Sequence, residues 1–337
     1  MEEEVTKQLS QILKAVKILA PDSLLFAGHI ISPPVAGNSS QQPPADPRTL
    51  MTQHLEQLLY LQCYCRLFTG EIDHRQSPTS ADSGFVKQLS DANGSREYLN
   101  RGWRLIQKLP TGHFVAEKNG LTRLLFTGEF VSHADLRGPA EQGTPISIFR
   151  PRESTTMHKG FYFVFGEALG DDHDDRDLLR LYWDVTAAGA TKLVSLITNE
   201  LNRFQISFRL KILNNPLAYI RRDAAVLYFN KRFYHLAAEL VSDIHQQIAN
   251  ELKPDTPLFS KKLAPGLGLA EEPTTGESFG QQRCRILAHA LWAAFEKKLD
   301  DEESQLREIS TLLQENGIDS ESPYRNAGSD QIYEFPV

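Results

Sequence analysis

The stretch ISFRLKILNNPLAYIRRDAAVLYFNKR, residues 206–232, decides how we expect this chain to fold. Apolar side chains occupy every second position from residue 206 to residue 212, which is the period of a β-strand with one buried face. The apolar run at residues 224–229 predicts a second strand, and the pattern after it predicts a helix over about residues 232–252. The stretch therefore indicates a sheet with helices packed against it.

The flanking sequence extends this sheet. Two further strands are expected around the acidic turn of residues 170–177, at residues 160–168 and 178–185. A long loop at residues 254–277 precedes a last pair of helices that begins near Ser278, and its glycines and interleaved apolar residues favour a functional loop over a disordered one. We therefore predict an α+β domain over residues 151–337, with a mixed β-sheet and packed helices.

The first 150 residues predict two regions of different type. Residues 101–150 indicate a small β meander, because short strands alternate with turn signals, of which Asn119-Gly120 is a strong hairpin signal. The N-terminal section, residues 1–100, is expected to contain helices at residues 4–19 and 50–68, a proline-rich linker at residues 32–48 and a mobile connection at residues 70–97.

Composition limits the environment and the partners. The formal net charge of −7 argues against nucleic acid as a partner, and no apolar run is long enough to cross a membrane. The N-terminus carries acids where a general signal peptide would need basic residues, so we expect a cytoplasmic protein; a type III secretion signal would escape this reasoning. Cys63, Cys65 and Cys284 are expected to be reduced thiols in the core.

The most informative chemical feature is a basic cluster at residues 203–232, where seven lysines and arginines accompany one acid, Asp223. Strand alternation makes Arg209 and Lys211 project from the same face. Guanidinium groups match phosphate oxygens in pairs, and a lysine among them gives up its charged form more readily, so it can act as a general base. For this strand alone, a simple solvent-exposed face is the favoured alternative.

A second feature is the segment GESFGQQRCR, residues 276–285, where glycine and a helix start could approach an anion. Ser278 and Arg283 would then face that anion, although Ser278 alone is more often just a helix cap. His158 opens a strand and could act as an acid, and an ordinary surface histidine is its alternative. The acidic turn at residues 170–177 lacks ligand periodicity, so we expect no metal and no cofactor. Hydrolase, redox, zincin, kinase and Walker signatures are all absent from the sequence.

The second half of the chain resembles a known family. The blocks HKGFYFVFGEA, RLYWDVTAAGATKLVSLITNELNRFQISFRLKILNNPLAYIRRDAAVLYFNKRFY and PLFSKKLAPGLGLAEEPTTGESFGQQRCRILAHAL, over about residues 157–291, resemble the HopA family of type III effectors, and bacterial, notably cyanobacterial, relatives more closely than plant-pathogen effectors. Members occur as effectors in plant cells. HopA-like domains also act beside kinase-like proteins in lanthipeptide biosynthesis, where they are thought to be lyases on phosphorylated serine or threonine.

The resemblance therefore implies a metal-independent β-elimination on a phosphorylated peptide or protein. It makes Lys211 the candidate base and His158 the candidate acid. The candidate phosphate-binding residues are Arg203, Arg209, Arg222, Ser278 and Arg283. Phosphothreonine lyases of other effector families keep a lysine two residues before a histidine on one strand, whereas here Arg209 precedes Lys211. A non-catalytic effector-like or peptide-binding module is the alternative, and a metal-dependent phosphatase is disfavoured because the clustered groups are cations.

Overall fold

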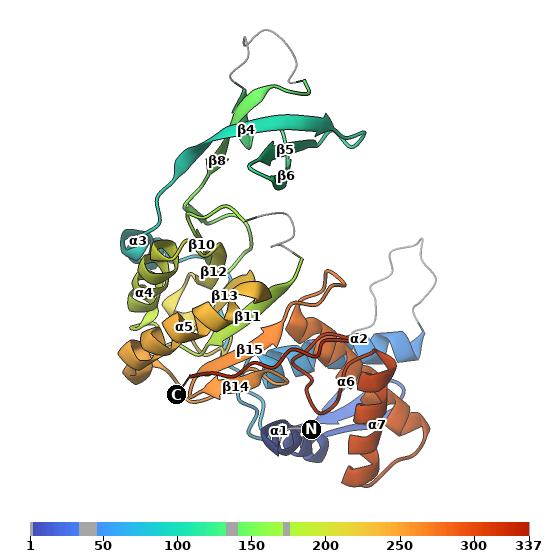
Figure 1. Cartoon of the computed structure of the whole chain (residues 1–337). Helices are drawn as coiled ribbons and strands as arrows, with labels where there is room; N and C mark the ends of the chain where they lie inside the picture. The colour runs from blue at the N-terminus through green and yellow to red at the C-terminus, as the bar shows by residue number, and fades with distance from the viewer. Residues whose placement is uncertain (1–2, 34–45, 133–140, 171–175, 337) are drawn as a thin grey trace.

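The computed structural model describes residues 3–33, 46–132, 141–170 and 176–336. Within these residues the centre of the molecule is a seven-stranded sheet in the order β14-β15-β11-β13-β12-β10-β9 (Figure 1). Its strands are β9 (Glu153–Ser154), β10 (Phe161–Phe165), β11 (Leu178–Trp183), β12 (Phe208–Leu213), β13 (Ala225–Asn230), β14 (Lys261–Ala264) and β15 (Leu267–Glu271). The α+β class is confirmed. Each described pairing in this sheet is antiparallel, however, where the sequence predicted a mixed sheet.

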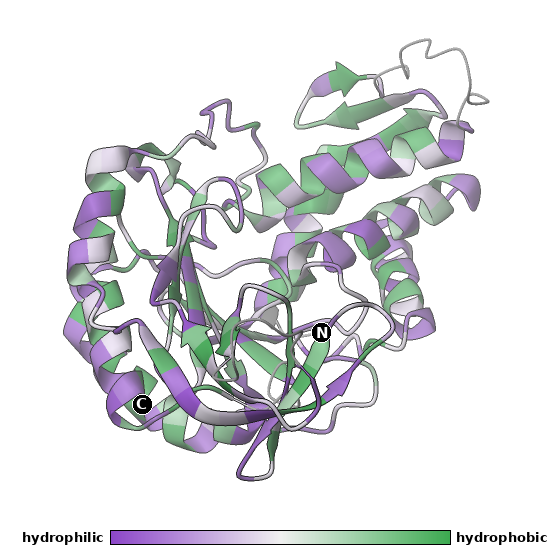
Figure 2. Ribbon diagram, turned by 90° about the horizontal axis from the view of Figure 1, so that it is seen from above, coloured by the Kyte–Doolittle hydropathy of each residue, from purple (hydrophilic) through white to green (hydrophobic). Residues whose placement is uncertain are grey.

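Helices cover both faces of this sheet. The helices α4 (Ala190–Arg203) and α5 (Tyr234–Ile248) lie side by side over one face (Figure 1). On the other face, the rings of Tyr64 and Phe279 pack against Tyr182 of β11, with centroids 6.4 and 6.3 Å away. The predicted last pair of helices is present as α6 (Phe279–Glu296) and α7 (Glu302–Glu315). Figure 2 shows apolar residues on the strands and on inward helix faces.

The long loop predicted at residues 254–277 is in large part a β-hairpin. Its strands β14 and β15 extend the sheet, because β15 pairs with β11 along five residues. Periodicity alone did not reveal it, since β15 is buried along its whole length and shows no alternation.

The N-terminal section is more structured than its composition indicates. Its elements are α1 (Glu3–Ala15), β1 (Val16–Ala20), β2 (Ser23–Phe26), β3 (His29–Ile31), α2 (Pro47–Leu59), the π-helical turn η1 (Tyr60–Tyr64) and α3 (Ser83–Ala92). The helix α3 lies where the sequence predicted a mobile connection. It folds because Phe85 and Leu89 are buried, and the Phe85 ring packs 5.6 Å from that of Tyr219. Most of the proline-rich stretch, residues 34–45, lies outside the described residues.

The meander sheet is a second, smaller unit at one end of the molecule (Figure 1). Its strands, in the order β6-β5-β4-β8-β7, are β4 (Tyr98–Lys108), β5 (Phe114–Lys118), β6 (Leu121–Leu125), β7 (Phe130–Ser132) and β8 (Pro145–Arg150). The predicted hairpin is present, with φ of 54° at Asn119 and 83° at Gly120. Two positive φ values are what a two-residue turn of this type requires. Trp103 and Leu105 anchor a core separate from the main one.

One large core joins the N-terminal section to the C-terminal domain. It includes Leu9 of α1, Leu55 of α2, Leu210 of β12 and Leu287 of α6. The three cysteines are free and buried, as the sequence predicts. None of the helices in the described part of the chain is long and apolar enough to span a membrane.

Candidate functional site

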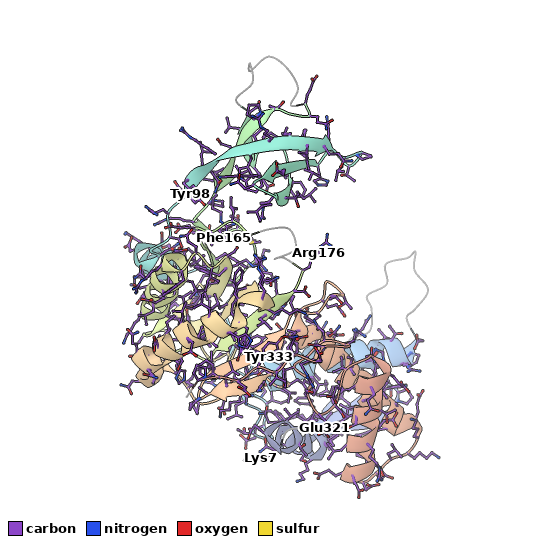
Figure 3. All side chains as sticks on the ribbon, in the orientation of Figure 1. Lys7, Tyr98, Phe165, Arg176, Glu321 and Tyr333 are labelled. Carbon is purple, nitrogen blue, oxygen red and sulfur yellow. The ribbon has the colours of Figure 1, made fainter. Side chains whose placement is uncertain are left out.

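A polar cavity of about 170 Å³ opens where the central sheet meets the meander sheet. It is lined by Arg123, Arg150, Phe165, Leu178, Ser207, Phe208, Arg209, Tyr228, Phe229 and Asn230. Phe165, labelled in Figure 3, marks its position between the two sheets. Three guanidinium groups face this small volume, and none of the described residues that line it is a carboxylate. Such a lining favours an anion.

Backbone carbonyl groups orient two of the three arginines. Arg123 at the middle of β6 donates from Nη1 to the Gly170 carbonyl oxygen at 2.6 Å. Arg150 at the end of β8 donates from Nε to the Gly166 carbonyl oxygen at 2.8 Å, and its guanidinium lies over the Phe165 ring. These bonds hold the two guanidinium groups at the cavity wall.

Arg209 is placed by the alternation of β12. Phe208 and Leu210 are buried on one face of the strand, and Arg209 is half-buried on the other. Its Nε atom is buried and has no hydrogen-bond partner in the described part of the protein. Leaving a buried N–H unsatisfied costs about 1–3 kcal/mol, so an acceptor bound in the cavity would relieve a real penalty.

Tyr228 lies among the basic side chains of the neighbouring strands. The strand register sets Arg209 and Arg180 directly opposite Tyr228 on its two neighbouring strands, so all three share one face. The Cζ atoms of Arg209 and Arg180 lie 4.8 and 5.2 Å from the ring centroid of Tyr228, and Lys211 Nζ lies 6.0 Å from it. Burial alone would raise the pKa of Tyr228, but the charges of Lys211, Arg180 and Arg209 outweigh it and leave the pKa below the usual value of 10.

The cations around Tyr228 differ in whether a nearby carboxylate neutralises them. Arg180 forms a buried, two-fold ion pair with Glu272. No described carboxylate lies within ion-pair distance of Arg209 or Lys211. Among the described residues, the two cations of β12 therefore have no ion-pair partner, although the charges of Arg221 and Lys211 together lower the pKa of the buried Asp223.

Lys211 shares a face with Arg209, as the sequence predicts. Its Nζ lies 4.6 Å from the ring centroid of Phe161, on the side of Tyr228 away from the cavity. Lys211 does not itself line the cavity, although its amine is next to the ring that forms the cavity wall.

The other predicted phosphate-binding arginines lie elsewhere. Arg203 is 72% exposed at the end of α4, and its Nη1 lies 3.8 Å from Glu200. Arg222 is buried and donates to the Thr256 carbonyl oxygen at 2.8 Å. Arg283 is fully buried and donates to the carbonyl oxygens of Pro323 and Arg325, both at 2.8 Å. The structure therefore does not bring these three arginines to the cavity.

Ser278 and His158 are also outside the cavity lining. Ser278 is the N-cap of α6, where its hydroxyl accepts from the Gln281 backbone N–H at 3.3 Å. His158 is exposed; its Nδ1 is 2.8 Å from the Lys159 carbonyl oxygen, and its ring packs on Phe161. Each contact corresponds to the structural alternative that the sequence left open.

Sequence reasoning missed Arg123, Arg150, Arg180 and Tyr228. The first two belong to a meander that carried no chemical signal of its own. Arg180 and Tyr228 lie on strands that were predicted, but their alignment with Arg209 depends on strand order and register. A residue count along one strand could not reveal that alignment.

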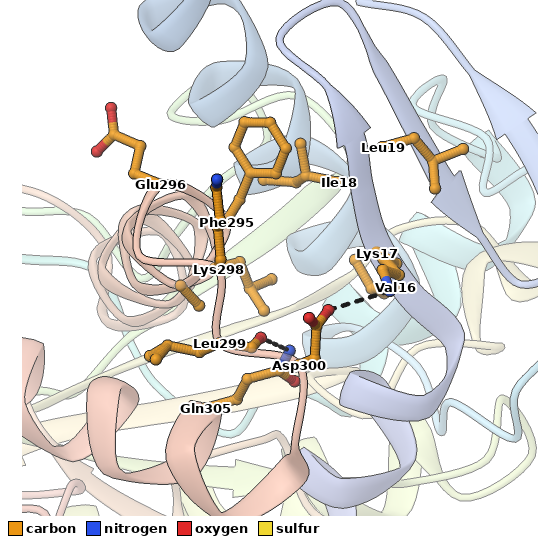
Figure 4. Close-up of a pocket in the computed structure, with 12 residues that line it drawn as sticks. Val16, Lys17, Ile18, Leu19, Phe295, Glu296, Lys298, Leu299, Asp300 and Gln305 are labelled. Carbon is orange, nitrogen blue, oxygen red and sulfur yellow. Dashed lines mark hydrogen bonds and ion pairs between the residues drawn. The ribbon is translucent and has the colours of Figure 1, made fainter.

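A larger cavity of about 530 Å³ lies between β1 and the end of α6 (Figure 4). Apolar side chains such as Ile18 and Phe295 line much of it. Of its two lysines, Lys17 pairs with Asp300 at 3.3 Å. Acids and bases are balanced there, so this cavity has no preference for an anion. Among the described residues, no group of three or more His, Cys, Asp or Glu side chains could hold a metal ion. Residues 171–175 of the acidic turn lie outside that description.

Comparison with known proteins found similar solved structures and one matching family model. A solved effector protein from Pseudomonas syringae pv. tomato strain DC3000 aligns over 85% of this chain and 92% of its own, with 18% identity and a TM-score of 0.46. A second, from Pseudomonas syringae pv. syringae strain 61, aligns over 83% and 97%, with 15% identity and a TM-score of 0.42. A search of curated proteins finds no match. The family model of the HopA1 effector protein family matches residues 152–325, which is just over half of the chain. The resemblance seen in the sequence is thus confirmed, and the chain belongs to the HopA1 effector protein family.

Proposed function

We propose that this protein binds a phosphorylated serine or threonine of a peptide or protein in the arginine-lined cavity and removes the phosphate by β-elimination, without a metal ion. The observation that supports this most is the convergence of Arg123, Arg150 and Arg209 on one cavity, whose described lining residues include no carboxylate. Guanidinium forks are suited to the oxygens of a phosphate group.

The reaction requires a base beside the phosphate site. Lys211 is that base in our proposal: its neutral amine takes the proton from Cα, the Cα–Cβ double bond forms, and the Cβ–O bond breaks. Arg209 and its two partners neutralise the charge on the departing phosphate. Among the described residues Arg209 has no carboxylate partner, and its Nε–H is buried and unsatisfied, which supports its role in anion binding.

The substrate must be phosphorylated before it arrives. We therefore propose that a kinase-like protein acts upstream and that a phosphorylated peptide or protein is the partner. The net charge of −7 makes the local positive cavity, rather than overall charge, the source of attraction.

Mass spectrometry of a phosphoserine peptide in the presence of a chelator tests the proposal. We expect the unsubstituted protein to form the alkene, and we expect Lys211→Ala and Lys211→Arg to form none while the phosphopeptide still binds. A base acts on the transition state more than on binding, which is why affinity should persist. Alkene formation by Lys211→Ala at the unsubstituted rate would remove Lys211 from this role.

A non-catalytic phosphopeptide-binding module is the second candidate. The position of Lys211 outside the cavity lining favours it, because the cavity can hold a phosphate without any base. Retention of a phosphorylated peptide without any alkene would support this function. Equal retention of phosphorylated and unphosphorylated peptides would show that the cavity does not bind the phosphate.

A further inference from the structure

We infer that Tyr228 is the general acid of this elimination and that its phenol protonates the departing phosphate. The inference rests on the proposed function. It assigns a catalytic role to a residue that the sequence reasoning did not consider, in place of His158, which is exposed and lies outside the cavity lining.

Tyr228 is placed to protonate the leaving group. An acid must touch the leaving group, whereas a base must touch the Cα proton on the other side of the breaking bond. Tyr228 lines the same cavity as the three arginines that would hold the phosphate. Lys211 lies beyond the Tyr228 ring, outside that lining. Tyr228 is therefore placed to act as an acid beside the phosphate, and Lys211 is placed to act as a base farther from it.

The charges around Tyr228 favour ionisation of its phenol. Other buried tyrosines of this sheet and its cover are harder to ionise than usual; burial raises the pKa of Tyr182, on the neighbouring strand, to about 12. Tyr228 is buried as well, yet the cations around it lower its pKa. The phenolate that remains after proton donation is therefore stabilised by Arg180 and Arg209, which are charged throughout, and by Lys211 once it has taken the Cα proton.

The protons balance over one turnover. Lys211 takes the Cα proton and becomes an ammonium group. The electron pair forms the double bond, the Cβ–O bond breaks, and the phosphate oxygen takes the proton of the Tyr228 hydroxyl. The ammonium of Lys211 then returns a proton to the phenolate beside it, which restores both groups.

The charged groups that face Tyr228 come from each neighbouring element. They are Arg180 of β11, paired with Glu272; Arg209 and Lys211 of β12; and Arg123 and Arg150 across the cavity. Of these described groups, Glu272 is the acid, the arginines are cations, and Lys211 is a cation when it is protonated. The acid form of Tyr228 must persist for catalysis, so we expect kcat to fall as the pH rises through the pKa of Tyr228.

The test compares two leaving groups in single turnovers of the full chain. Departing phosphate gains from protonation, whereas sulfate is a weak base and leaves without it. Tyr228→Phe should slow elimination from a phosphoserine peptide by about 100-fold or more and change that from a sulfoserine peptide by less than about 10-fold. Phosphopeptide affinity should change little, and the decline of kcat at high pH should disappear. Tyr219→Phe, which removes another buried phenol away from the cavity, is the matched control and should keep the unsubstituted pH profile.

The outcomes separate this inference from the proposed function. If the unsubstituted protein forms alkene and Tyr228→Phe does so at an equal rate with an unchanged pH profile, the acid role of Tyr228 is wrong and the lyase stands. If His158→Asn instead abolishes the high-pH decline, the acid is His158. If the sulfoserine peptide is not processed, the rate of Tyr228→Phe on the phosphoserine peptide and its pH profile decide whether Tyr228 is the acid. If the unsubstituted protein forms no alkene from any phosphopeptide, both the function and this role fall.

Discussion

Replacement of Arg209 should weaken phosphopeptide binding in a graded way. In the described part of the chain, its guanidinium has no carboxylate partner and its buried Nε has no acceptor, so a bound phosphate would gain a charged hydrogen bond there. Such a bond contributes about 1.5–3 kcal/mol, which corresponds to a Kd about 10- to 150-fold higher for Arg209→Ala. Arg209→Lys keeps the charge but loses the planar fork, so its Kd should lie between those of the other two proteins.

Titration calorimetry with a phosphoserine peptide measures this series, with the unphosphorylated peptide as the ligand control. Arg307→Ala is the matched protein control, because it removes an exposed arginine that pairs with Glu303 on α7. Its Kd should stay within about twofold of the unsubstituted value. If Arg209→Ala also stays within about twofold, the cavity does not bind the phosphate and the reasoning fails.

Three further predictions concern stability, titration and metal ions. Arg283→Met should lower the free energy of unfolding by about 2–4 kcal/mol in urea denaturation, because the carbonyl groups of Pro323 and Arg325 lose a buried donor; an unchanged midpoint would show that these bonds do not hold the C-terminal segment. In an ultraviolet titration of phenolate absorbance, the folded protein should lose a component below pH 10 on Tyr228→Phe substitution. The pKa of Tyr228 is lower in the folded protein than its unfolded value of about 10. Its ionisation therefore stabilises the fold increasingly as the pH rises between these two values, and contributes nothing at lower pH. Identical titrations of the two proteins would contradict this lowered pKa. Chelator treatment should leave alkene formation unchanged, and restoration of activity by an added metal would contradict the proposed chemistry.

Local patterns predicted those parts of the fold that local physics determines. Alternation on β12 correctly gave the shared face of Arg209 and Lys211, and Asn119-Gly120 correctly gave the hairpin of the meander. The hairpin of β14 and β15 was missed because a strand buried on both faces shows no alternation. The helix α3 was missed because only two of its apolar side chains carry its packing.

The candidate site was harder to predict than the fold, because it depends on contacts between distant segments. Charge density grouped Arg203 and Arg222 with Arg209, and a glycine-rich helix start added Arg283. Arg203 is exposed, however, and the other two are buried with backbone partners. Register then placed Tyr228 opposite Arg209, which no spacing rule on a single strand can reveal. Family resemblance indicated the half of the chain that contains Arg209 and Tyr228, whereas Arg123 and Arg150 of the same cavity come from the meander sheet outside it.

The measurement that tests the central claim most directly is the reaction of a phosphothreonine peptide with the full chain in heavy-oxygen water, in the presence of a chelator. Elimination breaks the Cβ–O bond, so the released phosphate keeps its own four oxygens and the peptide becomes lighter than its unphosphorylated form by one water. Our account predicts unlabelled phosphate together with this alkene. Labelled phosphate and a peptide with a restored hydroxyl group would mean hydrolysis, and would contradict the account.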